Sequence, residues 1–176
     1  MFESVWIELA IIGVVISLLL AKWRQYQSKH AFNVRISKKH LKKLQTLPCP
    51  KRQMGFIRAV NPYIFEEMIL TSFERMGHRI KRGTRYSGDG GIDGQVKISG
   101  VRCYIQAKRY KGHILAKDIE SFSELCKTNK VKGLFVHSGR TGKLSYQLKA
   151  PHIDIVSGER LLQLCKQEVF TPRFTK

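Results

Sequence analysis

The stretch GDGGIDGQVKISGVRCYIQAK, residues 88–108, decides the fold. Apolar and polar residues alternate on both sides of Ser99-Gly100, which predicts two antiparallel strands joined by a two-residue turn. In that register one side of the hairpin is apolar, and on the other side Asp93 lies opposite Gln106. Lys108 is the diagonal neighbour and lies within side-chain reach of this pair. An aspartate, an amide and an ammonium group therefore meet at the strand ends and predict a functional site.

The charge of the chain favours a polyanionic partner. Lys and Arg number 32 against 13 Asp and Glu, which gives a net charge of +19. Residues 1–52 hold ten of the basic and two of the acidic residues, so residues 53–176 hold 22 and 11. Both parts are basic, whereas a membrane tether alone requires a positive charge only near the anchor. Nucleic acid is therefore the expected partner of the folded part.

The amino-terminal segment predicts a membrane anchor. Residues 5–21 are apolar except for Glu8 and Ser17, a length at the short end of what spans a bilayer. The alternative is a buried amphipathic helix, which Glu8 favours. The basic residues that follow place the carboxyl side in the cytoplasm by the positive-inside rule. We expect residues 1–22 to cross the inner (cytoplasmic) membrane once, with the rest of the chain in the cytoplasm.

Residues 23–53 are expected to form a basic juxtamembrane linker. No acidic residue occurs between Glu8 and Glu66, and Pro48 and Pro50 interrupt any helix that precedes them. The segment can run as a basic helix on anionic membrane lipids, and DNA is the alternative contact. Residues 54–176 then form the globular domain.

The globular domain is predicted to be an α/β fold with a mixed β-sheet flanked by helices. The four cysteines are scattered, with no CxxC pair, which disfavours a structural zinc site and indicates buried reduced thiols. The expected element order is α-β-β-β-α-β-α-β-α, preceded by one transmembrane helix. The elements around the hairpin are a helix at 62–76, a strand at 78–82, a helix at 117–128, a strand at 132–137, a helix at 142–150, a strand at 152–156 and a helix at 159–168.

Five segments in order resemble the Mrr-like restriction endonuclease catalytic domain, a branch of the PD-(D/E)XK nuclease superfamily. They are NPYIFEEMILTSFERMGHRI (61–80), YSGDGGIDG (86–94), YIQAKRYKG (104–112), KGLFVHSGRTGKLSYQLKA (132–150) and IDIVSGERLLQL (153–164). The resemblance implies a restriction-endonuclease-like fold and a DNA endonuclease that uses Mg²⁺ or Mn²⁺. It also implies a role in restriction or defence against foreign or modified DNA.

The resemblance also assigns candidate site residues. Asp93 matches the family's metal-binding aspartate, and Gln106 and Lys108 match the two functional positions of the (D/E)XK motif, written QXK in this branch. Glu66 matches the acidic residue on the first helix that helps hold the metal, and the main chain of Ala107 offers a further oxygen. Lys108 would orient the attacking water or stabilise the developing charge. An amide brings no charge, so metal affinity is expected to be weaker than with Glu at position 106.

Several alternatives stay open beside this assignment. Glu67 is the alternative acidic ligand on the first helix, and Asp89 lies in the glycine-rich turn, where a capping role is favoured. The residues expected to contact DNA are Arg109, Tyr110, Lys111 and Arg85.

Two other functions compete with the nuclease. One is a non-catalytic, membrane-tethered DNA-binding protein, and the other is a Holliday-junction resolvase-like nuclease, which would need a homodimer. No separate DNA-recognition domain is apparent, so binding driven by the DNA backbone is expected rather than sequence-specific recognition.

Overall fold

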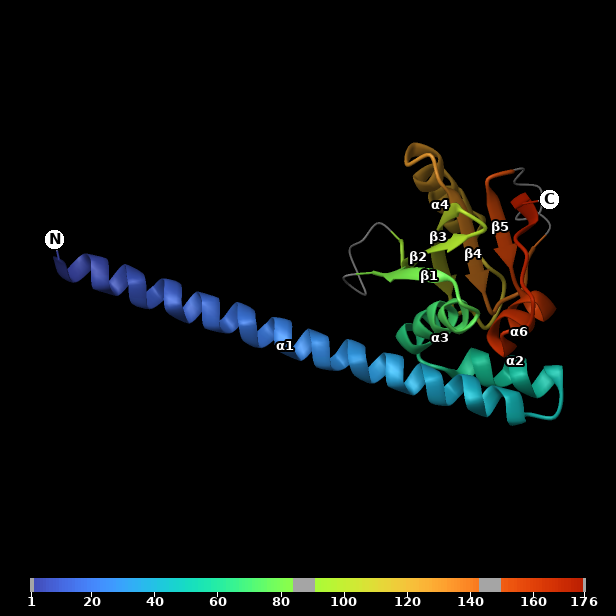
Figure 1. Cartoon of the computed structure of the whole chain (residues 1–176), viewed down its shortest axis with the longest axis horizontal. Helices are drawn as coiled ribbons and strands as arrows, with labels where there is room; N and C mark the ends of the chain where they lie inside the picture. The colour runs from blue at the N-terminus through green and yellow to red at the C-terminus, as the bar shows by residue number, and fades with distance from the viewer. Residues whose placement is uncertain (1, 84–90, 143–149, 176) are drawn as a thin grey trace.

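The protein folds around a five-stranded mixed sheet with helices on both faces, seen in a computed structural model that describes residues 2–83, 91–142 and 150–175 (Figure 1). The strand order is β1-β2-β3-β4-β5, with β1, β2 and β3 antiparallel and β3, β4 and β5 parallel. The elements are α1 (Phe2–Thr46), α2 (Pro50–Ala59), α3 (Pro62–Arg75), β1 (Arg79–Arg82), β2 (Gly94–Ile98), β3 (Val101–Lys108), α4 (Ala116–Thr128), β4 (Lys132–His137), β5 (Ile153–Val156), α6 (Gly158–Lys166) and the short 3₁₀ helix η1 (Arg173–Thr175).

The predicted fold class is confirmed, and the described elements from α3 to α6 follow the predicted order, whereas α2 and η1 were not predicted. The helix expected at 142–150 falls largely on residues 143–149, which lie outside the described residues. In the hairpin, Ser99 and Gly100 both have positive φ angles, 48° and 83°, which the tight turn between right-twisted strands requires. Val96 pairs with Cys103, as the assumed turn predicts.

The core has one cluster on each face of the sheet. The larger cluster lies between the sheet and helices α1, α2, α3 and α6, and the smaller lies under α4, where Phe122 packs on Phe135. Gly94 lets α3 approach the sheet, because a Cβ there would come within 2.5 Å of Leu70 Cδ2 and 3.0 Å of the Lys81 carbonyl oxygen. Because α3 packs closely on the sheet at Gly94, its acidic residues lie near the amino-terminal end of β2.

The long helix α1 extends beyond the predicted anchor. Its large apolar side chains from Ile11 to Leu20, together with Trp6 and Trp23, are exposed. Among the described residues this helix is long and apolar enough to cross a membrane. Figure 1 shows this half projecting from the domain, while the carboxyl half runs along α3. Leu41 and Leu44 are fully buried there. Residues 23–46 are thus helical and join the core at their carboxyl end, and the domain boundaries stay a prediction.

The cysteines are free thiols, and three of them lie in the core. Burial raises the pKa of Cys103 to about 11 and the pKa values of Cys126 and Cys165 to about 12. These thiols stay protonated at neutral pH and behave as small apolar side chains.

Candidate active site

Asp93 is held at the start of β2 by three main-chain hydrogen bonds. Its N–H donates to the Ile105 carbonyl oxygen at 2.9 Å, and its carbonyl oxygen accepts from Gly83 N–H at 3.0 Å. The Asp93 carboxylate accepts from the Ala107 N–H, with 2.6 Å between Oδ2 and N. The side chain is therefore fixed against the neighbouring strand β3, directly beside Gln106 and Lys108.

Gln106 presents a buried oxygen atom at this point. The residue is 7% exposed, and Oε1 has no hydrogen-bond partner among the described residues. The amide nitrogen packs against Gly91, which has a φ of 90° and where a Cβ would collide with Gln106 Nε2. A buried carbonyl oxygen without a partner is costly. The glycine-rich turn thus holds the amide in a position where a bound ligand can satisfy that oxygen.

Glu66, from the second turn of α3, belongs to the same site. Its pKa is raised to about 8 by burial first and then by the negative charges of Asp93 and Glu67, against the opposing effect of the Lys108 ammonium. These effects require Glu66, Asp93 and Lys108 to lie within electrostatic reach of one another. The structure therefore brings together the three charged residues predicted for the site. A cation between the two carboxylates would relieve their repulsion.

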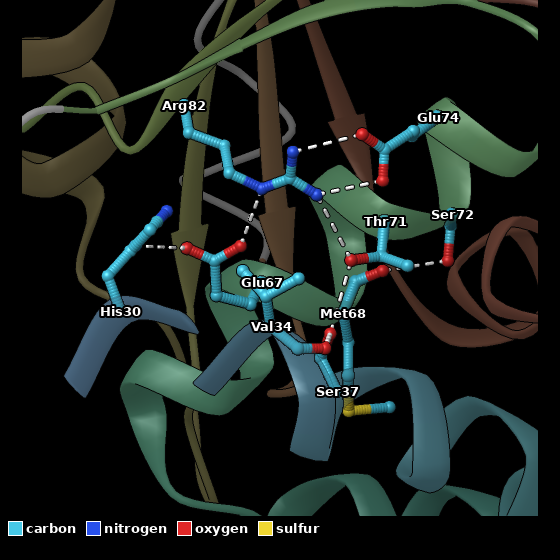
Figure 2. Close-up of polar contacts among 9 residues, drawn as sticks. All are labelled: His30, Val34, Ser37, Glu67, Met68, Thr71, Ser72, Glu74 and Arg82. Atoms are coloured by element: carbon cyan, nitrogen blue, oxygen red, sulfur yellow. Dashed lines mark hydrogen bonds and ion pairs between the residues drawn. The ribbon is translucent and has the colours of Figure 1, made fainter. Parts of the chain in front are cut away.

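Glu67 points to a different neighbourhood, shown in Figure 2. Its buried carboxylate pairs with Arg82 Nε at 2.9 Å and with His30 Nδ1 at 3.3 Å. Arg82 also donates to both carboxylate oxygens of Glu74, at 3.0 and 2.9 Å. These contacts join α1, α3 and β1, next to Gly83 and its hydrogen bond to Asp93.

Sequence reasoning missed this ion-pair network. The sequence offers Glu67 only as an alternative metal ligand, and His30 lies 37 positions before it in the chain. The only local signal in the sequence is an acidic residue, Glu67, on the predicted helix at 62–76, followed by Arg82 at the end of the next predicted strand. Here Glu66 faces the site and Glu67 anchors the helix that bears it.

The basic run after β3 is largely engaged within the protein. Arg109 Nη1 donates to the Arg58 carbonyl oxygen at 2.9 Å, near the end of α2. The Tyr110 hydroxyl donates to Asp118, and burial, together with that hydrogen bond, raises the pKa of Tyr110 to about 12. Lys111 is exposed. Arg85 and Asp89 lie outside the described residues. The predicted DNA contacts of this run stay a prediction.

His137 ends β4 as the parallel neighbour of Lys108. It is fully buried, which lowers its pKa to about 4, so the imidazole is neutral at pH 7. Its Nε2 atom lies 3.1 Å from Thr141 Oγ1. The residue packs the strand end beside the site without adding charge to it.

The ligand set at this site is mixed. Among the described residues, no three His, Cys, Asp or Glu side chains form a metal-binding group. The two carboxylates and the unpaired Gln106 amide oxygen instead offer only oxygen atoms. Oxygen ligands, few of them carboxylates, are what Mg²⁺ takes when it keeps several waters. The residues present therefore fit a hard divalent cation.

Comparison with known proteins places this site in a family. Residues 57–165, more than half of the chain, match the Mrr_cat family, described as a restriction endonuclease. The chain belongs to this family. It is 30% identical over 115 residues to the Type IV methyl-directed restriction enzyme EcoKMrr of Escherichia coli (strain K12). The aligned region covers 60% of this chain and 38% of that relative.

No solved structure matches the Mrr_cat chain significantly. Family membership and the five-stranded mixed sheet agree on a restriction-endonuclease-like fold. Because the chain spans less than half the length of its relative, the activity of the relative applies to it only as a proposal.

Proposed function

We propose that this protein is a metal-dependent DNA endonuclease of a restriction system, held at the cytoplasmic membrane by α1. The observation that carries the proposal is the site around Gln106. A buried amide oxygen without a partner among the described residues lies beside the Asp93 carboxylate, and the pKa of nearby Glu66 is raised by burial and by repulsion from Asp93. Such perturbed groups gather where a protein binds a charged ligand.

Each site residue has a chemical role in this proposal. Asp93 and Glu66 would hold Mg²⁺ or Mn²⁺ through carboxylates, and Gln106 and Ala107 would add an amide and a main-chain oxygen. A bound divalent ion supplies Lewis acidity at the phosphodiester and acidifies a water. Lys108 orients the attacking water or offsets the charge that develops on phosphorus.

The proposed substrate is based on the net charge of the chain and on its similarity to the E. coli enzyme. The net charge of +19 supports DNA as the partner, bound mainly through its phosphates. The name of the E. coli relative makes methylated DNA the first modified substrate to compare.

The anchor proposal depends on the exposed apolar half of α1. Its basic residues beyond the apolar run are exposed and suit anionic lipid headgroups, with the endonuclease domain on the cytoplasmic side. Whether two copies assemble as a homodimer is a separate proposal, which sedimentation of the purified chain tests.

A plasmid-cleavage assay tests the function. The full chain is purified in detergent and incubated with methylated and unmethylated plasmid in Mg²⁺, Mn²⁺ or EDTA. We expect metal-dependent cutting that is abolished by Asp93→Asn and by Lys108→Ala and kept by Lys51→Ala, an exposed lysine on α2. If the folded parent protein binds both plasmids and cuts neither, the nuclease function is refuted and a non-catalytic DNA-binding function takes its place.

A further inference from the structure

One side of the β1–β2–β3 sheet is open and basic. α3 and the larger core cover one face of these strands, whereas α4 on the other face packs against β4. The side chains of β1 and β2 that point away from α3 are therefore left uncovered by the described helices. The exposed basic residues on this side are Arg79, Lys81, Lys97 and Arg102. We refer to these four residues as the basic sheet face.

Strand pairing aligns the basic residues in a row. Arg79 pairs with Lys97, and Lys97 pairs with Arg102. Directly paired residues point to the same side of a sheet, and neighbouring strands lie about 4.8 Å apart. The three cations thus form a row about 10 Å long across the sheet. No acidic residue occurs in β1, β2 or β3 to neutralise it.

The row continues into a basic cavity. A hollow of about 480 Å³ lies between the end of the hairpin and the end of α4, and Arg102 is part of its wall. None of its described lining residues is acidic. Lys127 Nζ lies 3.9 Å from Glu124 Oε1, and both of these side chains are exposed. The other basic residues of the wall are Lys127, Lys130, Lys132 and His152.

The basic sheet face also leads to the candidate active site. Side chains alternate along a strand, so Lys97 and Asp93 lie on one side of the sheet, and so do Arg102 and Lys108. Along β3 this side is covered between Arg102 and Lys108, because Tyr104 is buried under α4 and Gln106 is also buried. The path along this face to the site therefore follows β2, where Lys97 and Asp93 lie about 13 Å apart at about 3.3 Å per residue. A duplex whose phosphates lie along this face can therefore reach the site.

We propose that the basic sheet face binds the phosphate backbone of the duplex that is cut at Asp93 and Lys108. The proposal rests on the proposed nuclease function and names its DNA-contact surface. Rows of Lys and Arg bind phosphates without reading sequence. DNA is favoured over lipid as the occupant because α1, which bears the apolar segment, packs on α3 at the opposite side of the sheet.

DNA affinity as a function of salt tests this surface. The full chain is placed in phosphatidylcholine nanodiscs with EDTA, so that nothing is cut, and titrated against a labelled duplex at several salt concentrations. The test variant combines Arg79→Gln, Lys97→Gln and Arg102→Gln. The control combines Lys39→Gln, Lys51→Gln and Arg52→Gln, which removes the same charge from exposed residues on α1 and α2.

The two variants are expected to differ clearly. Three lost phosphate contacts lower the magnitude of the slope of log affinity against log salt by about 2.7, at roughly 0.9 per phosphate. With the affinities of parent and variant taken as equal at about 1 M salt, this slope weakens binding at about 0.1 M salt roughly 500-fold. The control variant keeps the parent slope. Equal slopes for both variants would overturn the proposal, and so would a loss of affinity confined to nanodiscs that contain phosphatidylglycerol.

The same assay separates this proposal from the function on which it rests. Parent protein that binds DNA through the basic sheet face and never cuts it in Mg²⁺ would refute the nuclease and leave the surface supported. Parent protein that binds no DNA would refute both.

Discussion

Replacing Leu41 or Leu44 by alanine tests whether the second half of α1 is part of the folded domain. Both side chains are fully buried in the larger core, although they precede the residues that match the family. A Leu→Ala change at such a position costs about 2–5 kcal/mol, from lost transfer energy and the cavity left behind. Domains of this kind are stable by about 5–15 kcal/mol.

The double variant is therefore expected to lose most of the domain's stability. The two residues lie one helical turn apart and share neighbours, so their effects add incompletely, to about 4–8 kcal/mol. Lys42→Ala, at an exposed position between them, is the matched control and is expected to change stability by less than about 0.5 kcal/mol.

The assay must report on the sheet rather than on α1, because both tryptophans, Trp6 and Trp23, lie in α1. Hydrogen exchange of the β3 and β4 amides in the full chain, followed through a urea series, meets this need. If both leucine variants protect these amides as well as the Lys42→Ala control does, the docking of α1 is refuted. The predicted linker at 23–53 would then describe this segment better.

Three further predictions concern the site and its supports. Glu67→Gln leaves Arg82 without its buried partner on α3 and is expected to destabilise the chain by about 3 kcal/mol in urea unfolding. In metal-free protein, the raised pKa of Glu66 removes stability as pH rises from about 4.5 to 8. This loss of unfolding free energy is on the order of 1–3 kcal/mol after solvent screening, and Glu66→Gln is expected to abolish it. The check is the free energy of unfolding measured across that pH range. Gly91→Ala forces the Gln106 amide to move and, in a Mg²⁺ titration, is expected to raise the concentration needed for cleavage at least about tenfold.

Local patterns predicted the centre of the fold. The Ser99-Gly100 turn sets the pairing of β2 with β3, and the start of α3 follows from Asn61, whose side chain accepts a hydrogen bond from Tyr63 N–H at 3.0 Å. The position of Asp93 beside Gln106 could be predicted because the pairing of β2 with β3 determines it. Each of these features depends on residues close in sequence.

Long-range packing was harder to predict. The buried stripe of α1 begins with the polar residues Asn33 and Ser37 before it reaches Leu41 and Leu44, and basic residues surround it. In the sequence, this part of α1 therefore resembles a solvated basic helix. Ser37 Oγ lies 3.1 Å from Thr71 Oγ1 of α3, a buried contact that no periodicity reveals.

The same limit applies to Arg109 and Tyr110. Their basic and aromatic character suggested DNA contact, but their partners come from α2 and α4. Only the packing of these helices against the end of β3 determines which side chains of the run remain exposed.

The decisive experiment on metal-dependent cleavage at Asp93 and Gln106 is single-turnover cleavage of labelled duplex DNA by the full chain, with Mg²⁺ varied from zero to saturation. We expect the parent to cut only with metal and the Asp93→Asn variant not to cut. We expect Gln106→Glu to reach half-maximal rate at lower Mg²⁺, because a carboxylate replaces the neutral amide. Cleavage in EDTA, or cleavage by Asp93→Asn at the parent rate, would contradict these expectations.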